Sequence, residues 1–97
     1  MSWYVLHLRP RSEKKAVEFC RAMEIESYLP LRRETKIYQR RKVTVEKPLF
    51  PGYVFSRFDI MDQRIDVLRT SGVMTIVGTA HVATPVNDHE IEAIQRV

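Results

Sequence analysis

The sequence contains a single cysteine, three glycines and no long apolar run. One thiol, Cys20, forms no internal disulfide and holds no metal by itself, so a reducing compartment is expected. Three glycines cannot supply the phosphate-binding pattern G-x-x-x-x-G-K-S/T. No apolar stretch approaches the roughly 20 residues of a membrane span, and the first residues lack the features of a secretion signal. These absences predict a cytoplasmic domain with no membrane partner.

Sequence signals of an active site are also few. The three histidines, His7, His81 and His89, lie far apart, and none has a metal-ligand spacing with a cysteine or a carboxylate. No serine stands in the sequence context of a nucleophile elbow. A catalytic triad assembled from distant residues stays open at this stage. The patterns nevertheless favour a binding protein that is no enzyme and that has no cofactor and no metal.

Positive charge is concentrated in the segment 32–47. This segment holds seven basic residues against two acids, Glu34 and Glu46, whereas the net charge of the whole chain is +4. A localised positive field suits a polyanion or an acidic protein surface as partner. A basic hairpin that is only solvated is the alternative explanation.

The length of 97 residues is that of one domain, and the residue patterns alternate between strands and helices. Alternating or branched apolar runs predict strands over 3–8, 52–58 and 73–77. Apolar residues at helical spacing predict helices over 13–24, 62–71 and 88–97. The segment 28–31 is expected to be extended, and two short alternating arms predict a hairpin over about 33–47.

This order is typical of an α+β fold, with a ferredoxin-like or RNP-like antiparallel sheet and helices over one face. The basic β-hairpin and the last helix are additions to that pattern. Local signals mark the helix ends, with Ser12 and Asn87 as N-caps and Gly72 as a left-handed stop. The apolar stripe of the first helix is expected to contain Ala16, Phe19, Cys20 and Met23.

The strand over 52–58 carries aromatic side chains on one side. A period of two places Tyr53, Phe55 and Arg57 together, and the first strand is expected beside this one. Because helices of this fold cover one face, we expect the aromatic face to be bare, and exposed apolar patches mark binding surfaces. If helices cover both faces, the rings are core instead. A bare aromatic face suits either single-stranded RNA or an amphipathic helix from a protein partner.

The stretch 52–58 partly matches the RNP1 pattern of RNA-recognition motifs. Its glycine and three of its aromatic residues match, whereas Pro51, Val54 and Ser56 replace the basic, small and branched residues of that pattern. This partial match leaves one alternative function open, that of an RNA-recognition-like module for single-stranded RNA.

Several motifs of the sequence occur together in one known family. They are the opening WYVL, the extended YLPL, the basic ribbon and the stretch PLFPGYVF, followed by the segments 72–78 and 85–94. On these motifs the whole chain resembles the N-terminal (NGN) domain of NusG-type transcription elongation factors. The segments 9–15 and 48–51 resemble most the specialised antitermination paralogues of the RfaH and UpxY type. Full-length members carry a C-terminal KOW domain, and the resemblance leads us to expect only the N-terminal domain in residues 1–97.

The resemblance implies a transcription elongation and antitermination factor that binds RNA polymerase. Members dock on the clamp helices of the largest polymerase subunit, span the DNA cleft to the gate loop of the second-largest subunit, and suppress pausing. The histidine in the first strand stands where a tyrosine is often found. The resemblance places the clamp-helix contact on an apolar pocket made of Trp3, Leu6, His7, Phe50, Tyr53 and Phe55.

The resemblance also implies contacts outside this pocket. The gate-loop contact falls at the start of the second helix, on Gln63 and Arg64. Some members touch the non-template DNA strand. Nucleic-acid contact is implied for the basic residues Arg9, Arg11, Arg40, Arg41 and Lys42. The domain is expected to be a monomer.

Overall fold

The computed structural model describes residues 1–79 and 82–96, so His81 lies outside the described residues. Four strands form one antiparallel sheet in the order β2-β5-β1-β6. They are β1 (Ser2–Leu8), β2 (Glu26–Tyr28), β5 (Tyr53–Phe58) and β6 (Val73–Ile76). This order, with β1 beside β5 at the centre, is that of the split βαβ pattern. The prediction of an α+β fold with a ferredoxin-like sheet is therefore confirmed.

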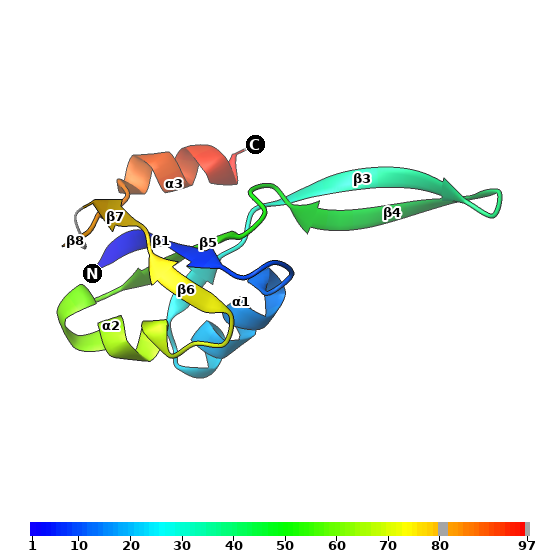
Figure 1. The fold of residues 1–97 in the computed structure, drawn as a ribbon. Helices are drawn as coiled ribbons and strands as arrows, with labels where there is room; N and C mark the ends of the chain where they lie inside the picture. Colours follow the sequence, from blue (N-terminus) through cyan, green and yellow to red (C-terminus); the bar gives the residue numbers. More distant parts are fainter. Residues whose placement is uncertain (80–81, 97) are drawn as a thin grey trace.

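Helices lie on both faces of this sheet (Figure 1). α1 (Glu13–Ala22) and α2 (Ile60–Leu68) cover one face, and α3 (Asp88–Gln95) lies over the other. Every second side chain of β1 and β5 points toward α1 and α2, because side chains alternate along a strand. The main core on this face consists of Tyr4, Leu6, Leu8, Ala16, Cys20, Ile25, Val54, Phe58 and Val67.

The second face of the sheet is not bare, contrary to the expectation from the sequence. Trp3 and Phe55 are each only 7% exposed, because they pack against Ile91 of α3. The backbone N–H of Val86 donates to the Trp3 carbonyl oxygen at 2.7 Å, which ties the segment before α3 to β1. The apolar side of α3, with Ile91 and Ile94, therefore buries two of the aromatic rings that the sequence placed on an open surface.

α1 turns a different face toward the core than its apolar residues predict. Ala16 and Cys20 are fully buried as expected, but Phe19 is 46% exposed. A carboxylate takes part instead, since Glu13 is 6% exposed and its Oε2 accepts a hydrogen bond from the Gly52 N–H at 3.2 Å. A pattern built on apolar residues alone misses such a side chain, because a hydrogen bond compensates its burial.

The starts of α2 and α3 follow from local hydrogen bonds. Asp59 caps α2 by accepting from the Met61 N–H at 2.9 Å, so this helix begins at Ile60 and not at 62 as predicted. Asn87 caps α3 as predicted, and it accepts from the His89 N–H at 2.9 Å.

Gly72 has a φ of +87°, so its backbone is left-handed as predicted, but it is not the stop of the helix, because α2 already ends at Leu68 with Arg69 as its C-cap. A Cβ at this position would stand 2.5 Å from the Cβ of Ser12, the N-cap residue of α1. We expect Gly72→Ala to lower the free energy of unfolding by more than about 1 kcal/mol, because both the backbone and this contact become strained. Urea denaturation measures the change. Ser71→Ala at the exposed neighbouring position should change it by less than about 0.5 kcal/mol, and equal stability of the two variants would contradict the argument.

A long two-stranded ribbon projects from the body of the molecule (Figure 1). It consists of β3 (Leu31–Tyr38) and β4 (Arg41–Pro48), which pair with each other and not with the main sheet. The projection makes the molecule elongated, at 52 × 28 × 26 Å. The predicted hairpin is confirmed, and its arms are longer than expected. A smaller hairpin joins β7 (Gly78–Thr79) and β8 (Val82–Ala83).

The turn of the ribbon explains why its register was not evident. Tyr38 pairs with Arg41, so the turn contains only Gln39 and Arg40. Both turn residues have positive φ, at 48° and 64°. Two-residue turns of this kind usually contain Gly, Asn or Asp, whose absence removes the sequence signal.

Candidate functional site

Three rings reach the surface beyond the part of the sheet that α3 covers. Phe50 and Tyr53 are 41% and 38% exposed, and His7 is half-buried. His7 and Tyr53 are cross-strand partners, and their rings stack with centroids 5.1 Å apart and planes at 22°. Phe50 makes an edge contact with the buried Phe55 ring at 6.2 Å. We call His7, Phe50 and Tyr53 the aromatic patch.

A tight turn before β5 holds the aromatic patch in place. Gly52 has a φ of +85°, and its carbonyl oxygen accepts from the Leu8 N–H at 2.8 Å. The Glu13 carboxylate accepts from the Gly52 N–H, and the Tyr53 N–H donates to the Phe50 carbonyl oxygen at 3.1 Å. Glu13 therefore stabilises the turn that positions the aromatic patch. Its place at the start of a helix did not indicate this role.

The other predicted pocket residues lie below the surface. Trp3 and Phe55 pack under α3, and Leu6 is fully buried on the opposite face against α1 and α2. Strand alternation requires this of Leu6, because it stands next to His7 in β1. A partner that docks on this surface reaches the aromatic patch and not these three side chains.

One cleft connects the aromatic patch to α2. His7 and Tyr53 line a cavity of about 550 Å³ together with Arg64 and part of β6. The two predicted gate-loop residues are separated, because Gln63 lines a different cleft. The side chain of Gln63 accepts a hydrogen bond from the Asp59 N–H at 2.9 Å, so it serves to start α2.

The strand register sorts the charges of the ribbon onto two faces. Even positions of β3 share a face with odd positions of β4, because directly paired residues point to the same side. The opposite face carries Arg33, Lys42 and Glu46. The sequence does not by itself group the ribbon charges in this way, because the grouping depends on the turn. We call the face with the even positions of β3 and the odd positions of β4 the cationic face. Its charged residues are Arg32, Glu34, Lys36, Arg41 and Lys47.

The predicted nucleic-acid residues lie in three places. Arg40 is in the turn, Arg41 is on the cationic face, and Lys42 is on the opposite face of the ribbon. Arg9 and Arg11 are exposed in the loop between β1 and α1. Arg11 lines a cleft of about 580 Å³ together with residues at the end of β4, so this loop lies at the base of the ribbon.

Neither a metal centre nor a membrane-spanning helix is found in residues 1–79 and 82–96. In this part of the chain, no three His, Cys, Asp or Glu side chains are grouped so as to hold a metal ion. Over the same residues, no helix is both long and apolar enough to cross a membrane.

Comparison with known proteins identifies the family. The family model described as "Transcription termination factor nusG" matches residues 1–95. The chain belongs to the NusG family. It is similar to the transcription termination/antitermination protein NusG of Deinococcus radiodurans, with 30% identity over 97% of this chain. It is also similar to a solved structure of Thermotoga maritima NusG that concerns domain interaction in that protein. The TM-score is 0.69, with 29% identity over 99% of this chain.

The chain spans 60% of the Deinococcus NusG and 56% of the Thermotoga NusG chain. The activities and partners of those longer proteins are therefore proposals for this chain. NusG-family proteins are transcription factors and not enzymes, as the sequence predicted for this chain. The closer resemblance to RfaH-type members stays a prediction.

Proposed function

We propose that this chain acts as the N-terminal domain of a transcription elongation and antitermination factor that binds RNA polymerase. The aromatic patch docks on the clamp helices of the largest subunit, and the domain extends across the DNA cleft to the gate loop of the second-largest subunit. Held in this position, the domain keeps the clamp closed and suppresses pausing. The observation that carries the proposal is an exposed aromatic patch on the sheet of a NusG-family chain.

The aromatic patch has the chemistry of a helix-binding surface. Tyr53 and Phe50 present large rings, and aromatic anchors of this kind carry much of the binding energy at protein interfaces. The rings are held by strand pairing and by the turn at Gly52, so docking orders few additional side chains. His7 adds a polar edge to the patch.

The proposed gate-loop contact rests on Arg64. This side chain is exposed, whereas the Gln63 side chain is engaged in the hydrogen bond to the start of α2. We therefore assign Gln63 a positioning role and Arg64 the contact.

The alternative of a single-stranded RNA module has less support. RNA-recognition motifs stack bases on exposed rings of their central strands. Here the central-strand rings of Trp3 and Phe55 pack under α3, which leaves only Tyr53 and His7 accessible on those strands.

A direct test compares two ligands. The chain is mixed with a fragment of the polymerase clamp helices in a pull-down, and with random single-stranded RNA in filter binding. Binding of the fragment, together with fewer pauses when the chain is added to a transcribing polymerase, is the expected result. Tight RNA binding without fragment binding would overturn the proposal.

The proposed nucleic-acid contact of the ribbon gives a further prediction. Reversing Arg40 and Arg41 to Glu should weaken binding to duplex DNA. It should also make the slope of log affinity against log salt concentration shallower, by about 1 for each phosphate that the ribbon no longer neutralises. Fluorescence anisotropy over a salt series measures both quantities. Reversing Lys15 and Arg21, two exposed cations of α1, makes the same change of net charge away from the ribbon. Equal slopes for the two double variants would count against the ribbon contact.

A further inference from the structure

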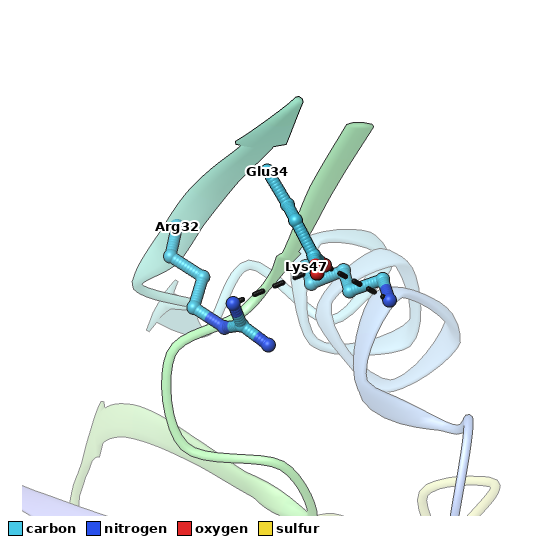
Figure 2. A network of polar contacts seen from close by, with 3 residues as sticks. All are labelled: Arg32, Glu34 and Lys47. Atoms are coloured by element: carbon cyan, nitrogen blue, oxygen red, sulfur yellow. Dashed lines mark ion pairs between the residues drawn. The ribbon is translucent and has the colours of Figure 1, made fainter. Parts of the chain in front are cut away.

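The cationic face contains a point where two cations meet one carboxylate (Figure 2). Lys47 Nζ lies 3.0 Å and Arg32 Nη1 lies 3.9 Å from the same oxygen, Glu34 Oε2. The two side chains approach this carboxylate from different sides. The Glu34 side chain is 34% exposed, but Oε2 itself is closed off from solvent. One carboxylate oxygen thus occupies the centre of a small anion site.

Lys36 belongs to the same group. The Lys47 ammonium beside it lowers the pKa of the Glu34 carboxyl, and the charges of Lys36 and Arg32 act in the same direction. The positive charge of Lys47 also lowers the pKa of Lys36. Lys36, Lys47 and Arg32 thus share one face of the ribbon with a single acid, and Lys47 and Arg32 contact that acid directly. Removal of that acid leaves three cations that another anion can stabilise.

We propose that this group binds a backbone phosphate of duplex nucleic acid, and that Glu34 fills the phosphate position in the unbound chain. A phosphodiester oxygen takes the place of Glu34 Oε2 between Lys47 and Arg32, and the carboxylate swings out to solvent. The exchange replaces one oxygen anion with another, so the cations keep their geometry. The inference rests on the nucleic-acid contact of the proposed function. It adds the cations that bind the phosphate and the acid, Glu34, that competes with the phosphate for them.

The shape of the ribbon favours a duplex. The ribbon projects from the body, and its side chains are largely exposed on both faces. A two-stranded β-ribbon fits the major groove of DNA, where its edges and faces lie against the phosphate backbones. Arg41, at the tip end of the cationic face, extends the positive surface beyond the Glu34 group.

The opposite face of the ribbon supplies an internal control. There Arg33 Nε lies 3.8 Å from Glu46 Oε1, and both side chains are well exposed. Glu46 thus has one loosely held cation, whereas Glu34 has two direct partners and a third cation nearby. Glu34→Gln and Glu46→Gln remove the same charge from the same ribbon, and only the first empties the anion site.

The experiment measures the affinity of the 97-residue chain for a short random DNA duplex at 0.1 M salt. We expect Glu34→Gln to raise the affinity about five- to tenfold, the size of one added phosphate contact at this salt concentration. Glu46→Gln should raise it less than about twofold. In a Lys47→Gln background the gain from Glu34→Gln should disappear, because the phosphate then lacks its nearest cation. Ribbon amide shifts by NMR confirm that each variant keeps its register.

Equal gains from the two glutamine variants would overturn the inference, because net charge alone would then explain them. No duplex binding by any variant would overturn it as well, and a larger gain on single-stranded RNA would overturn the choice of a duplex. The clamp-helix pull-down is run on the same variants, since Glu34 lies outside the aromatic patch. Intact fragment binding without the duplex effect refutes the phosphate site alone, whereas absence of fragment binding by the unmodified chain refutes the proposed function.

Discussion

Replacing Phe55 with alanine is expected to lower the free energy of unfolding by about 3–5 kcal/mol, the range for truncation of a buried phenylalanine. The ring is 7% exposed and packs with Trp3 and Ile91 between the sheet and α3. Its removal leaves a cavity that the β-sheet cannot close. Because small domains are stable by only about 5–15 kcal/mol, the variant should lose much of its cooperative unfolding transition. Urea denaturation followed by circular dichroism measures the loss.

Phe19→Ala is the matched control for this effect. Phe19 is also an aromatic residue, but it is 46% exposed on α1, so its truncation should cost less than about 1 kcal/mol. If Phe55→Ala instead kept full stability and only lost binding of the clamp-helix fragment, α3 would not be covering that ring in solution. The sequence-based interpretation of Phe55 as a surface contact would then be correct.

Tyr53→Ala should have its largest effect on binding. Tyr53 is an exposed ring of the aromatic patch, stacked on His7, so its truncation removes a contact anchor and leaves no buried cavity. We expect affinity for the clamp-helix fragment to fall by about 2 kcal/mol or more, which is roughly 30-fold. The urea midpoint should move little. Isothermal titration calorimetry with the fragment, alongside urea denaturation, separates the two effects.

Two variants sharpen this test. Tyr53→Phe keeps the ring and should keep most of the affinity, whereas Phe19→Ala removes an exposed ring elsewhere and should not change it. Unaltered affinity of Tyr53→Ala would remove the aromatic patch from the proposed interface. A large loss of stability in that variant would show that the ring is part of the core.

Strand alternation predicted much of the candidate site. It placed Tyr53 and Phe55 on one side of β5, and in the structure neither ring belongs to the core that packs against α1 and α2. Alternation is a local property of extended backbone, so it holds whatever packs on the sheet. It carries no information on which of the two rings is covered. The docking of α3 decides that, through Ile91 and the hydrogen bond from Val86 to Trp3.

The ribbon shows the same division between what the sequence predicts and what the tertiary structure decides. The density of basic residues over 32–47 predicted a positive surface, since charge counts do not depend on the fold. The placement of Arg32, Lys36 and Lys47 on the same face as Glu34 depends on the cross-strand register. That register follows from a turn of Gln39 and Arg40, two residues that carry no hairpin signal.

By itself, the amino-acid sequence determined the order of the main strands and the helices, the side to which each strand residue points, and the family motifs. These depend on spacing between near neighbours, and hydrogen-bond geometry makes that spacing regular. Only the tertiary structure decided that α3 shields Trp3 and Phe55, that Glu13 supports the turn at Gly52, and that two cations of the ribbon contact one carboxylate. Each of these joins residues distant in the chain, and the free energy of such contacts depends on packing that no local pattern records.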